Sequence, residues 1–229
     1  MDNKTYEMVI RYIKTEIMAG RLKPGEKLPP ERELAEQLQI SRTSIREALR
    51  TMEVLGVVES VQGAGNYISV NFEKSMTEAL SMMFLLRQTD SRQLNDIRAA
   101  MELKAAELAV QRLNDGQIAE LESIISEMAE ANDEDTAADL DRKLHYAIAC
   151  ASENVILIQI LNAMSVLIDG FIRKIRTSIL QYTENKERLL DIHRAIVDAF
   201  KTRDIAAIQE AFRHHEDIIR ENLADTESL

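Results

Sequence analysis

Four histidines and one aspartate in the second half of the chain have the residue types of a metal site. His145, His193, His214 and His215 are all the histidines of the sequence, and Asp141 precedes His145 by four residues. Residues four apart on a helix share a face, so Asp141 and His145 can point at one ligand. Nitrogen and oxygen donors without thiolate suit zinc, nickel, manganese or iron better than copper(I). Spacing alone leaves open the alternative that these histidines are core or surface residues.

A second group of residues, in the first third of the chain, suits DNA. Arg42 and Arg46 are four residues apart and therefore share a helix face. An arginine can donate two hydrogen bonds to O6 and N7 of guanine. Ser41, Thr43 and Ser44 are short hydroxyl donors suited to phosphates. The two arginines alone are equally compatible with an ordinary solvated helix face.

Two neighbouring segments extend the DNA-binding pattern. Arg32 lies near the start of the preceding expected helix, within reach of the DNA backbone or a groove edge. Gln62 and Gly63 lie at a glycine-rich tip between two strand-like segments. A glycine has no Cβ, so this tip can approach the minor groove closely.

The elements expected around these residues form a winged helix-turn-helix. Apolar periodicity and turn residues predict helices at 4–19, 30–38 and 42–55. Strands follow at 57–61 and 66–70, with the glycine-rich tip between them. In this module the second helix of the pair lies in the DNA major groove. The order of elements therefore favours DNA binding over a merely solvated face.

Beyond residue 70 the strand pattern disappears and helical periodicity continues to the end of the chain. Seven helices are expected, at 74–88, 90–113, 115–131, 134–151, 153–180, 184–201 and 204–223. The first of them is a candidate connector between domains. The expected fold is mainly α, with a winged helix-turn-helix domain at 1–70 and an all-α bundle of six or seven helices at 71–229.

Composition agrees with two domains that have different partners. The net charge is −11, yet residues 1–70 contain ten basic and ten acidic residues, so the excess acid lies after residue 70. An acidic second domain would repel DNA and leave contact to the first. The single Cys150 excludes an internal disulfide. No apolar run approaches the ~18 residues of a membrane span. A soluble cytoplasmic protein is expected.

The segment LPPERELAEQLQISRTSIREALRTMEVLGVV at 28–58 resembles the winged domain of the GntR family of bacterial transcription regulators. The resemblance covers residues 4–70. It implies a homodimer on double-stranded DNA with a palindromic operator. In relatives of the FadR type, the DNA-contacting positions match Arg32, Arg42, Thr43, Ser44, Arg46, Gln62 and Gly63.

The second domain resembles FCD, the effector domain of the FadR subfamily. Three segments carry the resemblance: Asp141-Arg-Lys-Leu-His145, Asp191-Ile-His193 and Phe212-Arg-His-His215. The metal ligands there match Asp141, His145, His193 and His215, with His214 as a neighbour. One departure is Leu144, where an aromatic residue is common and which should alter packing rather than coordination. Zinc is the first choice of metal.

The resemblance also implies a small carboxylate effector at the open metal positions. An arginine of the family's first long helix matches Arg98, whose alternative role is a surface ion pair with Asp96 or Glu102. A hydroxy acid, a sugar acid and a dicarboxylate all remain open. We expect the effector to modulate operator affinity.

A helical-bundle metalloenzyme with a DNA-anchoring module is the alternative function. A di-iron bundle would need paired Glu-x-x-His motifs, and a hydrolytic zinc site would favour His-Glu-x-x-His. Neither pattern is present in the sequence. We therefore expect a regulator and no catalytic residues.

Overall fold

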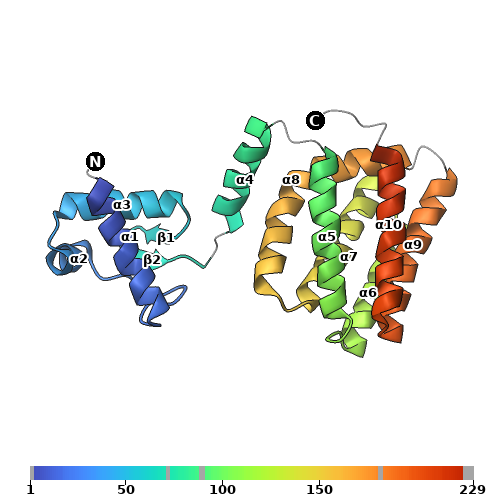
Figure 1. The fold of residues 1–229 in the computed structure, drawn as a ribbon, viewed down its shortest axis with the longest axis horizontal. Helices are drawn as coiled ribbons and strands as arrows, with labels where there is room; N and C mark the ends of the chain where they lie inside the picture. The colour runs from blue at the N-terminus through green and yellow to red at the C-terminus, as the bar shows by residue number, and fades with distance from the viewer. Residues whose placement is uncertain (1–2, 71–72, 88–90, 180–182, 224–229) are drawn as a thin grey trace. The chain divides into compact units, whose positions relative to one another are not determined.

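The computed structural model describes residues 3–70, 73–87, 91–179 and 183–223. The chain divides into two compact units, Met1–Ala79 and Leu80–Leu229. Both units consist mostly of helices, which Figure 1 labels and colours in order from the N-terminus to the C-terminus. The mainly α fold class is confirmed, with a short hairpin confined to the first unit.

Three helices and one hairpin make up the first unit. They are α1 Asn3–Met18, α2 Glu31–Leu38, α3 Arg42–Val54, β1 Val58–Val61 and β2 Gly65–Ile68. The strands are antiparallel, with Val58 opposite Ile68 and Val61 opposite Gly65. An isolated bridge between Lys27 and Tyr67 extends the pairing. The expected winged helix-turn-helix is therefore present, with the hairpin as the wing.

Local signals in the sequence explain where α3 begins and which face it buries. The Ser41 side chain caps the helix by accepting a 3.1 Å hydrogen bond from the Ser44 backbone N–H. Ile45, Ala48, Leu49 and Met52 are the buried residues of the helix, at the spacing expected of an inward face. They pack with Val9, Ile13 and Leu34 in one apolar cluster. The opposite face of α3 is thereby held toward solvent.

The second unit is a helical bundle. Its helices are α5 Ser91–Ala109, α6 Asp115–Glu130, α7 Glu134–Ala151, α8 Val155–Ile179, α9 Thr183–Thr202 and α10 Ile205–Leu223. The helix α4 Glu73–Arg87 spans the boundary between the two units. In the bundle α7 packs against α5, α6 and α8, and α10 packs against α5, α8 and α9. No helix among the described residues is long and apolar enough to cross a membrane.

Polar caps set the starts of the helices that carry the candidate metal ligands or support them. Asn114 and Gln117 form a reciprocal capping box at α6. Asp133 caps α7 by accepting a 2.8 Å hydrogen bond from the Thr136 N–H. The Asp204 carboxylate accepts a 2.8 Å hydrogen bond from the Ala206 N–H at the start of α10. The helix expected at 90–113 is shorter than predicted, because α5 ends at Ala109 and turns precede the Asn114 cap.

Candidate metal centre and DNA-binding surface

Three helices of the bundle bring the four predicted metal ligands together. Asp141 and His145 come from α7, His193 from α9 and His215 from α10. One ligand atom from each residue lies within 4.8 Å of all the others. All four side chains are buried, and His193 has no exposed surface. The ring centroid of His215 lies 4.8 Å from that of His145 and 5.1 Å from that of His193.

The surrounding core holds these imidazoles in place. Leu144, the departure from the family pattern, is completely buried in the apolar core beside His145. The ring of Phe212, one turn before His215 on α10, meets the rings of His145 and His215 edge-on. Apolar packing therefore fixes the direction in which the ligand side chains point.

The hydrogen bonding of the cluster fits a bound cation. Both ring nitrogens of His145 and of His193 are buried without a hydrogen-bond partner. His193 Nε2 lies 2.9 Å from Asp141 Oδ1, and His145 Nδ1 lies 3.1 Å from the Glu102 carboxylate, but neither contact is aligned as a hydrogen bond. A buried polar group without a partner costs about 1–3 kcal/mol. A divalent ion shared by the four residues would satisfy one nitrogen of each of these imidazoles.

The protonation of the cluster also suits a metal. Burial would raise the pKa of Asp141, but His193, His145 and Arg176 outweigh it and hold that pKa well below the usual range. Burial lowers the pKa of His193 and that of His215. Metal ligands must be an ionised carboxylate and neutral imidazoles. These directions favour the required forms at neutral pH.

His145 behaves differently because Glu102 faces it from α5. Burial alone would lower the pKa of His145. The Glu102 carboxylate raises that pKa by more than burial lowers it, so the net pKa lies above the ordinary value. A carboxylate behind a ligating histidine is a common outer partner of metal sites. Glu102 was not singled out as a site residue from the sequence.

Arg98 is a buried residue of the same region. Its Nε donates a 2.6 Å hydrogen bond to Glu102 Oε1, and its side chain is 9% exposed. The alternative role expected from the sequence was a surface ion pair with Asp96 or Glu102. Arg98 does pair with Glu102, but the pair lies inside the bundle and not on the surface. Asp96 instead pairs with Arg220, at 2.8 Å. Arg98 thus adds a buried positive charge beside the cluster of Asp141 and the three histidines.

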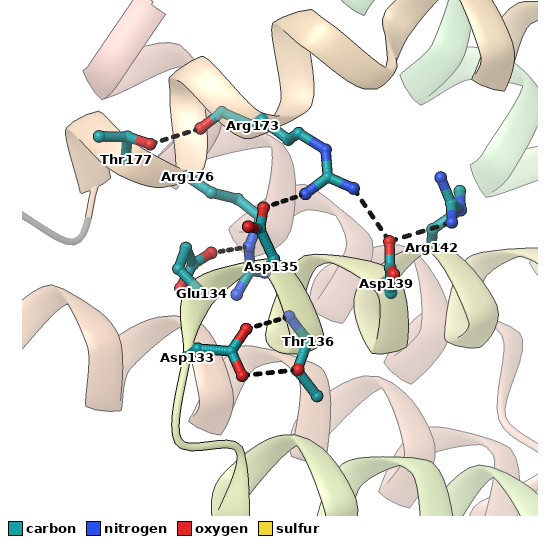
Figure 2. A network of polar contacts seen from close by, with 9 residues as sticks. All are labelled: Asp133, Glu134, Asp135, Thr136, Asp139, Arg142, Arg173, Arg176 and Thr177. Atoms are coloured by element: carbon teal, nitrogen blue, oxygen red, sulfur yellow. Dashed lines mark hydrogen bonds and ion pairs between the residues drawn. The ribbon is translucent and has the colours of Figure 1, made fainter.

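Arg176 on α8 is a second buried cation, and it was not predicted from the sequence. Its Nη1 donates a 3.0 Å hydrogen bond to Asp141 Oδ1, and its Nε donates a 2.5 Å bond to Glu134. Figure 2 shows the contact with Glu134 at the start of α7. In the sequence Arg176 closely follows Arg173 and Lys174 and lies in no recognisable motif, so nothing distinguished it from its basic neighbours.

A small cavity separates the two arginines. Arg98, Arg176, Asp141 and His215 provide its polar lining, and Ile179, Leu189 and Ile219 provide its apolar wall. Its volume of about 20 Å³ is enough for about one water molecule.

In the first unit, the predicted DNA-contacting residues lie on the solvent side of α2, α3 and the wing. Exposed residues are Arg32, Ser41, Arg42, Thr43, Arg46, Gln62 and Gly63, and Ser44 is half-buried at the start of α3. Gly63 has a φ of +76°, a conformation that glycine adopts without strain. The structure thus leaves all eight residues on the surface or at its edge.

Comparison with known proteins identifies the family. Residues 93–217 match the FCD domain, and residues 5–68 match the bacterial regulatory proteins of the gntR family. The chain belongs to the GntR family of transcription regulators. The FCD domain alone covers more than half of the chain, as the resemblance in the sequence predicted.

Relatives of this GntR regulator are regulators as well. The transcriptional regulator LutR of Bacillus subtilis is 30% identical over 201 residues, which are 87% of this chain and 92% of LutR. The putative L-lactate dehydrogenase operon regulatory protein of Escherichia coli is 29% identical over 198 residues, 85% of this chain and 76% of that protein. A solved GntR structure from Streptococcus agalactiae has a TM-score of 0.69 and 26% identity, and covers 95% of this chain and 99% of that one. These families and relatives are transcription regulators and not enzymes, as expected.

Proposed function

We propose that this regulator binds operator DNA through residues 1–70 and that a small carboxylate, bound beside a divalent metal in residues 71–229, changes its operator affinity. The observation that carries the proposal is the buried set Asp141, His145, His193 and His215, whose ligand atoms converge within 4.8 Å. Burying such groups without a ligand is unfavourable, so the cluster is best explained by an ion. Zinc is the first candidate, with nickel, manganese and iron as the others.

The DNA contact is proposed for α3 and the wing. Arg42 and Arg46 are exposed on α3, and both carry donors for guanine. Ser41, Thr43 and Ser44 at the start of that helix suit phosphates. A homodimer would place two such helices on the halves of a palindromic operator. Operator binding of this kind takes place in the cytoplasm.

The effector site is proposed next to the metal. A bound divalent ion supplies positive charge and positions that an anionic oxygen can occupy. Arg98 is the buried cation that would hold the same carboxylate. One relative bears the name putative L-lactate dehydrogenase operon regulatory protein, so small hydroxy acids are the first class to test.

The size of the cavity suggests how the effector acts. A space of about 20 Å³ holds a water molecule but not a hydroxy acid, so neighbouring side chains must move to admit one. A ligand shifts an equilibrium between two arrangements only by its difference in affinity for them. An effector that binds only the expanded arrangement would therefore favour that arrangement and alter DNA binding.

A combined binding experiment tests this proposal. Duplexes that wild-type protein prefers are selected from random sequences, and bound metal is measured by elemental analysis. Hydroxy acids, sugar acids and dicarboxylates are then screened by thermal shift with zinc and with a chelator. We expect one class to raise the melting temperature only with metal and to change duplex affinity. Wild-type protein that holds no metal and responds to no carboxylate would overturn the effector proposal.

A further inference from the structure

Arg46 is held by a carboxylate from another helix. Its Nε donates a 3.1 Å hydrogen bond to Glu31 Oε1, and its Nη2 donates a 2.7 Å hydrogen bond to Glu31 Oε2. Glu31 is the first residue of α2, and Arg46 lies on α3. The Arg46 side chain is nevertheless 51% exposed, so one edge of the guanidinium is bound and the rest faces solvent.

Other arginines of this surface are held less firmly. Arg32 pairs with Glu36 of its own helix at 3.3 Å, and both side chains are more than two-thirds exposed. Arg50 likewise pairs with Glu47 on its own helix. Single exposed pairs along a helix contribute little and leave both side chains mobile. A two-point contact between helices fixes the plane of the guanidinium as well as its position.

The bound edge leaves the base-reading edge available. A guanidinium carries five N–H donors, and the contact with Glu31 engages one on Nε and one on Nη2. The remaining hydrogens on Nη1 and Nη2 form the far edge of the group. Guanine presents O6 and N7 side by side in the major groove, which is the pattern that two such donors match.

The surroundings of Glu31 favour the ionised form of its carboxylate, which is the form that pairs with Arg46. Pro30 caps α2 without a side-chain hydrogen bond, and Glu31 lies in the first turn, where the helix dipole favours an anion. The hydrogen bond from Arg46 lowers the pKa of Glu31; burial opposes this, and the charges of Arg46, Arg42 and Arg50 add to the lowering. Three arginines of α3 thus act on one carboxylate.

We propose that Glu31 is a positioning residue for sequence reading, which holds Arg46 by its Nε–Nη2 edge and directs the Nη1–Nη2 edge at a guanine of the operator. The inference rests on the proposed operator binding by α3. Without the carboxylate, the Arg46 side chain would lose its conformational freedom only when DNA binds. The free side chain could then adopt a rotamer that contacts a phosphate instead of a guanine. Glu31 therefore contributes to discrimination between sequences more than to affinity for DNA in general.

The test compares Glu31→Gln with Glu33→Gln. Both substitutions remove one negative charge from the first turn of α2, but Glu33 contacts Gln37 and not Arg46. Affinity is measured for the selected duplex and for a duplex in which the guanine read by Arg46 is replaced. A good two-point contact gives about 1–3 kcal/mol of discrimination, so we expect Glu31→Gln to reduce the affinity ratio about tenfold. Glu33→Gln should leave that ratio unchanged.

Further variants separate positioning from a purely structural role. If Glu31 only tied α2 to α3, its loss would weaken binding to both duplexes equally and lower the melting temperature, with the ratio intact. In an Arg46→Ala background, Glu31→Gln should cause no further fall in the ratio. An unchanged ratio in Glu31→Gln would overturn the inference while leaving operator binding in place. Failure of wild-type protein to prefer any duplex would instead overturn the proposed function.

Discussion

Arg176→Met tests whether Arg176 and a metal ion compete for the Asp141 carboxylate. The side chains of Arg176 and Asp141 are 7% and 5% exposed, and their contact is 3.0 Å. Removing one partner of a buried ion pair costs about 3–5 kcal/mol, because the other charge stays buried without compensation. We expect this loss for metal-free protein, together with a fall in melting temperature of the helical unit of about 2–4 °C for each kcal/mol. Methionine keeps most of the side-chain length, so packing changes little.

Zinc should reduce that loss. A divalent ion at the cluster supplies Asp141 with positive charge, so the carboxylate no longer depends on Arg176. By linkage, Arg176→Met should bind zinc more tightly than wild type, about tenfold for each 1.4 kcal/mol by which zinc lessens the destabilisation. Urea unfolding followed by circular dichroism, with chelator and with zinc, gives both quantities. The chain has no tryptophan to report by fluorescence.

Arg173→Met is the matched control on the same helix. Arg173 contacts Asp135 and Asp139, as Figure 2 shows, but both carboxylates are more than half exposed. Such a surface pair is worth about 0–1 kcal/mol, and its loss should not depend on zinc. Equal destabilisation of Arg176→Met with chelator and with zinc would refute the reasoning, since Arg176 and the ion would then not compete for Asp141.

Three further predictions follow from the site and the DNA-binding surface. His193→Ala should lose bound metal in elemental analysis, whereas His214→Ala should keep it, because His214 is exposed and outside the cluster. Arg42→Ala should abolish preference for the selected duplex in band-shift titrations with little change in melting temperature, because its side chain is exposed. The lowered pKa of Glu31 contributes stability that is present above its ordinary pKa of 4.5 and lost as pH falls through the lowered value. Glu31→Gln should therefore make the stability fall less steeply as the pH drops below the ordinary pKa of 4.5; an unchanged fall would contradict this.

The helices were predictable because their boundaries are encoded locally. Ser41, Asn114, Asp133 and Asp204 lie at helix starts and are read from neighbouring residues alone. The end of α5 was less predictable: apolar periodicity continues through Val110 and Leu113, which are buried although the helix has already ended. Burial of a residue after a helix produces the same pattern as one more helical turn.

The four residues of the Asp141 cluster could be singled out in the sequence because three of them are of a rare residue type. Asp141 and His145 share a helix face, and the sequence has few histidines to choose from. Arg176 and Glu134 were missed because arginine and glutamate are common, and 42 positions along the chain separate them. Their contact depends on how α7 packs against α8, which no short spacing reveals.

The charges of the buried site give a physical reason for metal and effector to bind together. Arg98 is paired with Glu102 and Arg176 with Asp141, so these four buried charges cancel. Burial favours neutral His193 and His215, and a bound metal would require neutral His145 as well. A divalent ion would then add two positive charges to a poorly solvated interior. The half-exposed Glu134, which also pairs with Arg176, offsets at most one of them, so the ion is unfavourable there without an anion. A carboxylate effector would relieve that excess, so its affinity should fall sharply when the metal is removed, and metal affinity should rise in its presence by the same factor.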